Sequence, residues 1–285
     1  MKSGRIRAAC VAAFALLVLA LPLEAQVTFF GKELLGRITN KSVTINLAAD
    51  RDVEVYFEYG TQPGVYTGRT GATARPGGAP FNTLIDGLQA NTRYFYRTRY
   101  REPGAAVYES RAEHSFRTAR PRGETFTFAI QFDPHMDENS SADVYNLTLQ
   151  NELAAAPDFL IDLGDTFMSD KLQPITQQGI HDRVRLMRSY YDVVGHSMPL
   201  LLSLGNHEGE WGRNLNGTEN NVAVWNTNLR KQYIPNPVPD GFYSSDQTVE
   251  PLVGVRESYY SFEWGDALFG VLDPYWHCLL YTSPS

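Results

Sequence analysis

The sequence predicts an all-β sandwich over residues 26–120, followed by an incomplete α/β (α+β) sandwich domain over residues 121–277. The first part shows strands with period-two alternation, Pro-Gly turns between them, and no helical period of useful length. The second shows three apolar strands that alternate with two amphipathic helices. The 285 residues are 43% hydrophobic and 12% aromatic, so ordinary cores can form and disorder is excluded as the main state.

Residues 1–25 have the pattern of a secretory signal peptide. A basic start from Lys2 to Arg7 precedes an apolar run from Ala8 to Pro22, and Ala25 ends a cleavage-like segment. The apolar run is shorter than a bilayer span requires, which leaves an uncleaved membrane anchor as the alternative. We therefore expect an exported protein, periplasmic or extracellular, with no stable membrane span after signal cleavage.

The net charge bears on whether the protein binds nucleic acid, and the positions of the cysteines bear on whether it forms disulfides. The formal net charge is −7, and a nucleic-acid partner would require a basic face, so we expect no nucleic-acid-binding face. Cys10 lies in the signal segment and Cys278 lies near the end of the chain. No disulfide is expected within the mature body.

The sandwich prediction rests on three strands, Val43–Leu47, Val53–Tyr59 and Tyr94–Tyr100, in which apolar and polar residues alternate. The segment Leu88–Arg97 resembles the corner that leads into strand F of fibronectin type III domains. The resemblance implies that the Tyr94 hydroxyl bonds to the chain just upstream. Tyr94 is thus expected to be structural, and residues 26–120 to form a fibronectin type III-like domain.

The α/β prediction follows the chain from Phe126. Apolar strands are expected at 126–132, 158–163 and 199–204, with helices that start after Ser140 and Ser141 and that run from about Ile180 to Val194. This β-α-β-α-β order implies parallel strands with right-handed crossovers. Sites in such sheets form at the carboxyl ends of the strands.

The rest of the chain is a long excursion followed by a hairpin. Residues 209–256 are rich in Asn, Gly, Pro and Tyr and are expected to be irregular, with a helix near Val222–Arg230. Loops of this length are often functional, and the alternative is a structural decoration. Two further strands, Glu257–Trp264 and Ala267–Asp273, are joined by Gly265-Asp266, which is a hairpin signal.

Polar residues of metal-ligand type follow each of the three predicted parallel strands. These are Asp133 and His135, then Asp165, then Asn206 and His207. Carboxylate, amide and imidazole groups together suit hard and borderline metals, and two neighbouring ions could hold a hydroxide nucleophile. Other acidic and imidazole residues are expected to be ordinary carboxylates of loops and strand ends, or surface and helix-end histidines; these are Asp158, Asp162, Asp273, His181 and His196.

Together, Asp133-x-His135, Gly164-Asp165 and Gly205-Asn206-His207-Glu208 resemble the first three motifs of the calcineurin-like metallophosphoesterase superfamily. With the sandwich in front, the chain is similar to relatives of the purple acid phosphatases. The resemblance implies two metal ions (Fe, Mn or Zn) and a small phosphate-ester substrate. It assigns Asp133 and His135 to the first metal, Asp165 to a bridge between both and Asn206 to the second metal, and makes His207 the catalytic contact with the substrate.

The chain departs from this pattern in two ways. Met168 and His135 differ from the purple acid phosphatases, which have a metal-binding Tyr where Met168 stands, so no purple band is expected. A later lone His and a Gly-His-x-His motif are missing before Ser285, and His277 is not assigned as their substitute. We therefore expect a C-terminally truncated chain with a non-native tail at 278–285, itself inactive.

The predicted function is hydrolysis of phosphate esters by a hydroxide that two metal ions activate. One alternative keeps the superfamily and assigns phosphodiesterase or nucleotidase activity. Another is a secreted binding protein with a decayed catalytic half. A downstream Gly-His-x-His motif in the complete reading frame would favour the enzyme.

Overall fold

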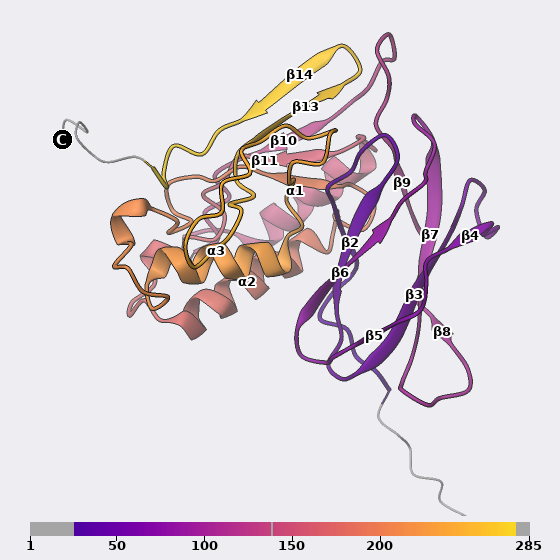
Figure 1. Ribbon diagram of the computed structural model, residues 1–285, viewed down its shortest axis with the longest axis horizontal. Coiled ribbons are helices and arrows are strands. Elements are labelled where there is room, and N and C mark those ends of the chain that lie inside the picture. The colour runs from indigo at the N-terminus through magenta and orange to yellow at the C-terminus, as the bar shows by residue number, and fades with distance from the viewer. Residues whose placement is uncertain (1–25, 138, 278–285) are drawn as a thin grey trace, which may run out of the picture.

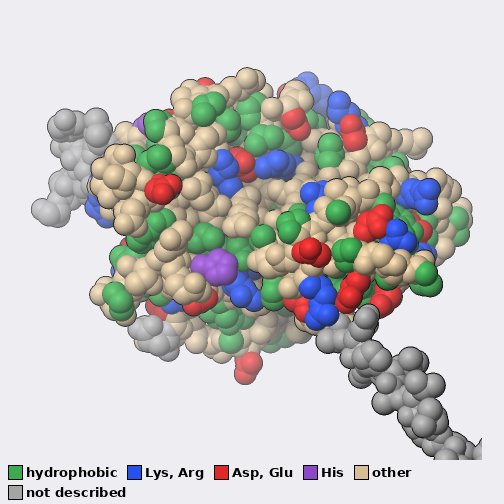
Figure 2. Space-filling model, turned by 60° about the horizontal axis from the view of Figure 1, so that its bottom comes forward, with side chains coloured by type: hydrophobic (Ala, Val, Ile, Leu, Met, Phe, Trp, Pro, Cys, Tyr) green, Lys and Arg blue, Asp and Glu red, His purple; other side chains and the backbone are tan. Residues whose placement is uncertain are grey.

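The structure is a computed structural model that describes residues 26–137 and 139–277 (Figure 1). The predicted signal peptide at 1–25 and the predicted tail at 278–285 lie outside the described residues. Among the described helices, none combines the length and the apolar character that crossing a membrane requires. On the face shown in Figure 2, acidic and basic side chains are interspersed rather than gathered by sign.

The first part of the chain forms two antiparallel sheets that face each other. One sheet has the order β1-β2-β6, and β3 and β7 form the centre of the other. The strands are β1 (Leu34–Gly36), β2 (Val43–Ala48), β3 (Val53–Gly60), β4 (Gly68–Arg69), β5 (Thr73–Arg75), β6 (Pro80–Ile85), β7 (Arg93–Arg101), β8 (Glu109–Ser110) and β9 (His114–Arg117). The three strands predicted from alternation are all present, which confirms an all-β arrangement here.

Strand β2 differs from its prediction, because it is buried on both faces rather than on one. The polar residues of its outer face meet the second part of the molecule instead of water. Asn46 Nδ2 donates to the Gln232 carbonyl oxygen at 3.0 Å, so a side chain predicted to be solvated joins the two parts.

The predicted hydrogen bond of Tyr94 is confirmed. Its hydroxyl oxygen accepts from the Gln89 backbone N–H at 3.0 Å, five residues upstream. The Tyr94 ring is buried and stacks on Phe116, with ring centroids 5.9 Å apart. The corner before β7 is thus fixed by one hydrogen bond and one aromatic contact, and Tyr94 has a structural role there.

The predicted β-α-β-α-β unit is confirmed. Strands β10 (Ala129–Gln131), β11 (Leu160–Asp162) and β12 (Leu200–Leu202) pair in parallel in that order, and α1 (Ala142–Ala154) and α2 (Gln177–Tyr191) connect them. The paired strands are shorter than the apolar segments, because only three residue pairs of each ladder form. Helix α1 begins as predicted, since the Ser141 hydroxyl caps the Val144 N–H.

Strands β11 and β12 are buried on both faces, which fits their continuous apolar runs, whereas Ile130 of the edge strand β10 is 50% exposed. Phe159, Ile161 and Leu201 pack in one core with the hairpin of β13 (Tyr260–Trp264) and β14 (Ala267–Val271). The alternate residues Leu160 and Leu200 pack in another core with α1 and α2. Figure 1 shows the hairpin on one side of the sheet and the helices on the other.

The predicted hairpin is confirmed, with Trp264 opposite Ala267 across the Gly265-Asp266 turn. The excursion at 209–256 is largely irregular and contains η2 (Gly212–Asn214) and α3 (Val222–Tyr233), so its helix starts as expected and runs three residues further. A short turn of helix, η1 (Ser169–Lys171), follows β11.

For His196 a surface or a helix-end position was expected, and the structure shows the second without the first. His196 follows the end of α2, but it is buried, with 8% of its surface exposed. Its ring stacks on His114 of β9 with centroids 4.1 Å apart, because the two parts of the molecule meet at this point. His181 is half-buried on α2, with its Nε2 2.8 Å from the Tyr233 hydroxyl.

Candidate metal centre

Three of the predicted site residues lie together where β10 and β11 end. Asp133, His135 and Asp165 each offer one ligand atom, and these atoms all lie within 4.8 Å of one another. His135 Nε2 is 3.5 Å from Asp165 Oδ2. We call these three residues the Asp133 group. Asp165 is buried, His135 is half-buried and Asp133 is exposed, so the group opens from the sheet edge to solvent.

The backbone of the Asp133 group is strained. Asp133, His135 and Asp165 have φ values of 50°, 42° and 51°, in the left-handed region that residues with a Cβ rarely adopt. Backbone hydrogen bonds hold this geometry: Asp133 N donates to Gly164 O at 3.1 Å, and His135 N donates to Asp165 O at 3.3 Å. Such strain, maintained by the surrounding structure, is typical of binding and catalytic sites.

The motif glycines allow two loops to touch. A Cβ on Gly164 would lie 2.0 Å from the Gly205 nitrogen, and a Cβ on Gly205 would lie 2.2 Å from Asp165 Oδ1. Any larger residue would push the loops after β11 and β12 apart. The glycines thus bring the third motif against the second.

Glu208 holds the same two loops together from inside. Its carboxylate accepts backbone hydrogen bonds from Gly205 at 2.5 Å, Thr166 at 2.6 Å, Asp165 at 3.1 Å and Phe167 at 3.3 Å. The side chain is 1% exposed, and burial raises the pKa of Glu208 to about 7 in spite of these N–H donors. Glu208 therefore positions the backbone of the site.

His207 lies beside the Asp133 group. Its backbone N–H donates to Asp165 Oδ1 at 2.8 Å, and its ring is 5.5 Å from the His135 ring, centroid to centroid. His207 Nδ1 lies 2.8 Å from Asp170 Oδ2. Because a carboxylate only accepts hydrogen bonds, Nδ1 carries the proton and Nε2 is left for another partner.

Sequence reasoning missed Asp170. It stands in η1, and the only signal was a second acidic residue five positions after Asp165. No rule of spacing connects it to His207, 37 residues further along, because the loop after β11 decides where it lies.

Asn206 lies on the exposed turn between Gly205 and His207. Its carbonyl oxygen accepts from Trp211 Nε1 at 2.7 Å, while its side-chain amide makes no hydrogen bond among the residues that the structure describes. The structure brings the Asn206 backbone to the site, and the role of its amide as a metal ligand stays a prediction.

The other carboxylates singled out from the sequence have protein partners. Asp158 pairs with Arg120 at 2.5 Å, and Asp273 pairs with Arg256 at 2.9 Å. Asp162 is fully buried below the site and accepts from Gln131, Tyr191, Thr166 and Gly164; burial raises its pKa.

The donor set of the Asp133 group fits a divalent metal. Two carboxylates and one imidazole converge, and in the described part of the chain no Lys or Arg forms an ion pair with either carboxylate. Oxygen and imidazole ligands suit Mn, Fe and Zn. Met168 stands where the purple acid phosphatases have a metal-binding Tyr. It is buried with 1% exposure and has no phenolate oxygen to offer a metal.

Comparison with known proteins identifies one solved structure with a similar fold over most of this chain. No protein-family model and no curated protein sequence matches the chain. The solved structure of PhoD superposes with a TM-score of 0.60 at 16% identity, over 87% of this chain and 52% of the PhoD chain. The chain thus shares the PhoD fold and spans about half of its length. At this identity the likeness shows the fold alone.

Two smaller structures also match over nearly the whole of their own chains. They are the sensor domain of the anti-sigma factor RsgI4 in Pseudobacteroides cellulosolvens (TM-score 0.24, 14% identity, 35% of this chain and 94% of that one) and the fn3 domain of the human collagen alpha-1(XX) chain (TM-score 0.22, 18% identity, 40% and 95%). Their TM-scores are too low to define a common fold.

Proposed function

We propose that the complete protein hydrolyses phosphate esters at a metal centre built on the Asp133 group. The observation that carries the proposal is the convergence of Asp133, His135 and Asp165 within 4.8 Å, with His207 alongside. The motif resemblance and the fold shared with PhoD point the same way.

In this proposal Asp133, His135 and Asp165 would hold one metal ion, and Asp165 and Asn206 would help to hold a second. The ions would supply Lewis-acid chemistry, lowering the pKa of water and neutralising charge on the phosphoryl group. His207 would meet the substrate with Nε2, since Asp170 holds Nδ1 at 2.8 Å. In the imidazolium form, which carries a proton on both nitrogens, Nε2–H would donate to a phosphoryl oxygen or give its proton to the leaving oxygen.

The proposal extends to organisation and location. Residues 26–120 and 121–277 would be two domains, a division supported by the pairing of β1–β9 among themselves. The basic and apolar start of the sequence supports export. Cell fractionation of the full-length protein checks this location.

Titration of the chain with Mn²⁺ by calorimetry tests the proposed site directly. We expect saturable binding that the Asp165→Asn variant weakens by about 100-fold or more. Asp266→Asn, an exposed carboxylate at the tip of the β13–β14 turn, is the control and should bind as the parent does. Equal affinity in all three proteins would refute the site.

Hydrolysis is tested with mono- and bis-(p-nitrophenyl) phosphate plus Mn²⁺. On the complete protein, preference between them separates phosphatase from phosphodiesterase activity. Residues 26–277 alone should turn over little substrate, because the expected remaining ligands are not among them. Robust metal-dependent turnover by that segment would show that it needs no further ligands.

A further inference from the structure

Two segments far apart in the sequence, 209–213 and 273–276, lie against each other beside the candidate metal centre. Gly212 N donates to Tyr275 O at 3.2 Å. A Cβ on Gly212 would lie 1.9 Å from the Trp276 carbonyl oxygen, so only glycine permits this approach. The contact brings the rings of Trp211 and Tyr275 together, with centroids 4.9 Å apart and planes at 55°. We call these two rings the stacking pair.

The stacking pair borders the site on the Asn206 side. Trp211 Nε1 donates to the Asn206 carbonyl oxygen at 2.7 Å, which ties the indole to the third motif. Tyr275 is held beside the same motif through its ring contact with Trp211. Both rings keep part of their surface exposed.

A positive charge accompanies the pair. The Arg213 guanidinium lies 4.2 Å from the centroid of the Trp211 ring, and Arg213 itself is exposed. Arg213 holds the outer part of the indole by a cation–π contact. It also places a cation next to an otherwise acidic centre, where an anionic substrate would arrive.

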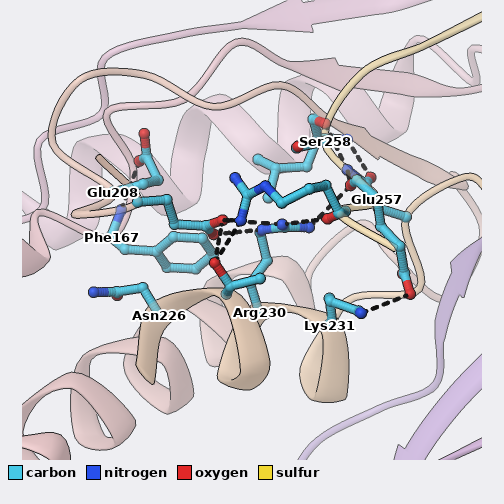
Figure 3. A network of polar contacts seen from close by, with 12 residues as sticks. Phe167, Glu208, Asn226, Arg230, Lys231, Glu257 and Ser258 are labelled. Carbon is cyan, nitrogen blue, oxygen red and sulfur yellow. Dashed lines mark hydrogen bonds and ion pairs between the residues drawn. The ribbon is translucent and has the colours of Figure 1, made fainter. Parts of the chain in front are cut away.

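A buried ionic network supports the pair from below. Glu210 binds Arg230 at 2.6 Å and Arg256 at 2.9 Å, and Arg256 binds Asp273 at 2.9 Å. We call these four residues the Glu210 network; Figure 3 shows Arg230 at its centre and Ser258, which also donates to Asp273. Each side chain is no more than 2% exposed, so the charges balance without help from water.

The network fixes both halves of the stacking pair. Glu210 directly precedes Trp211 in the chain. Asp273 also accepts a hydrogen bond from the Tyr275 N–H at 2.9 Å. Burying four charges is costly, and any movement that separates them leaves a buried charge without its partner, so the network favours one arrangement of the segments it joins. Here the geometry they define is that of two half-exposed rings at the edge of a metal-type site.

The alternative is that the two rings have only a structural role in packing the loop. A pair with that task would be buried, as Phe159 and Trp264 are in the core at a similar centroid distance of 4.7 Å. Trp211 and Tyr275 instead share the rim of the site with Asn206 and leave ring surface open. Half-exposed aromatic rings beside a polar centre are typical of a surface that binds a ligand.

We propose that the stacking pair binds the organic group of the phosphate ester, so that esters with a flat aromatic or heteroaromatic ring are preferred. Their rings would contact Trp211 and Tyr275 while the phosphate meets the Asp133 group and His207. This inference rests on the proposed function. The ring could belong to an aryl alcohol or to the base of a nucleotide, and the two sources share the same chemistry.

The test measures binding of non-hydrolysed or product-like ligands to the Mn²⁺-loaded complete protein, for which hydrolysis is proposed, by calorimetry. Phenylphosphonate is compared with cyclohexylphosphonate, which has the same charge and a non-aromatic ring of similar size. The 5′-methylenephosphonate analogue of AMP is compared with that of ribose 5-phosphate, neither of which has an ester bond to phosphorus, and inorganic phosphate reports on the metal centre alone. We expect the aromatic member of at least one pair to bind about three- to tenfold tighter. The pair with the larger ratio identifies the source of the ring.

Substitutions in the stacking pair test whether these two rings cause the preference for aromatic ligands. We define the aromatic ratio as the affinity for the aromatic ligand of a pair divided by that for its non-aromatic counterpart. Trp211→Leu and Tyr275→Leu should bring this ratio close to one, whereas Tyr275→Phe should retain it. Trp225→Leu, a part-exposed tryptophan on α3, is the matched control and should keep the parent ratio. Quenching of tryptophan fluorescence by phenylphosphonate should disappear in Trp211→Leu and persist in Trp225→Leu.

The outcomes separate the two proposals. If inorganic phosphate binds but the aromatic ratio is the same in the parent and in Trp211→Leu, the stacking pair is not a binding surface and the metal site stands. If inorganic phosphate does not bind in the presence of Mn²⁺, the proposed function fails and the stacking pair fails with it.

Discussion

Two groups of charged side chains contact the Gly205–Glu210 turn, one near Gly205 and the other at Glu210, and they are built in opposite ways. The Glu210 network is buried, and two carboxylates face two guanidinium groups at 2.6–2.9 Å. The Asp133 group opens to solvent, holds two carboxylates and one imidazole, and stands on three residues with positive φ.

The difference separates a structural cluster from a candidate ligand site. In the Glu210 network the two arginines supply the compensating charge, and the cationic neighbours lower the pKa of Glu210 to about 2 despite burial. Like charges in the Asp133 group repel each other unless a cation comes from outside. Charge balance and backbone strain therefore distinguish the two, although both would look alike in a list of acidic residues.

The largest expected effect follows from removing one charge of the Glu210 network. Arg256→Met leaves Asp273 buried without its cation and should lower the free energy of unfolding by about 3–5 kcal/mol. Arg122→Met is the control, because Arg122 and Glu263 are 74% and 57% exposed and their ion pair should contribute less than about 1 kcal/mol. Urea denaturation followed by circular dichroism measures both; similar midpoints for the two variants would show that the network adds no stability.

Removing a charge from the Asp133 group should reduce metal affinity and leave stability nearly unchanged. Asp165→Asn removes a charge that lacks a fixed cation, so the free energy of unfolding without metal should stay within about 1 kcal/mol of the parent. The expected loss of about 100-fold in Mn²⁺ affinity corresponds to about 2.7 kcal/mol of binding free energy. Stability and affinity are measured on the same preparation. A destabilisation as large as that of Arg256→Met would make Asp165 a structural residue like Glu210.

The sequence predicts one of these two groups and not the other, for a physical reason. Parallel strands carry their carboxyl ends to one edge, so Asp133, His135 and Asp165 could be grouped from strand order alone. The Glu210 network joins the turn after β12 with α3, residue 256 and the end of β14. Its members come from irregular segments, whose course is set by packing rather than by periodicity.

The same limit applies to Asp170, the stacking pair and β2. Asp170 and Tyr275 reach the site through loops, and no repeat or spacing marks them. Alternation in β2 predicted one solvated face, but Asn46 of that face contacts the second part of the molecule. Period-two patterns identify strands without telling whether a polar face meets water or another segment.

A third prediction tests whether the site depends on close approach of the backbone as much as on charge. Gly205→Ala places a Cβ 2.2 Å from Asp165 Oδ1 and 2.4 Å from the Asp165 nitrogen, which must separate the two loops. We expect a loss of about 2 kcal/mol in stability, together with weaker Mn²⁺ binding. Gly71→Ala is the matched control, since no atom lies within 4 Å of its Cβ and its φ is not positive. Unchanged Mn²⁺ affinity in Gly205→Ala would mean that the close approach does not shape the site.

The smallest expected effect concerns a third cluster, the stacked rings of His114 and His196. Here a titratable group is buried in its uncharged form rather than in an ion pair. Burial and the neighbouring His114 lower the pKa of His196 to about 4, Lys32 acts in the same direction, and Glu33 opposes them. The unfolded chain takes up this proton near pH 6.5, while the folded chain resists it until about pH 4. Stability from His196 is thus present above pH 6.5 and is lost as pH falls towards 4.

Because solvent screens part of this pair, we expect a contribution of about 1 kcal/mol rather than the full value of the shift. His196→Gln removes the titration and should flatten the fall in unfolding free energy between pH 6.5 and 4 by that amount. Urea midpoints at steps across this range measure it. Parallel curves for the parent and His196→Gln would show that the His114–His196 stack takes up protons as readily as an unfolded chain, and the distinction between neutral and charge-paired burial would fail at this cluster.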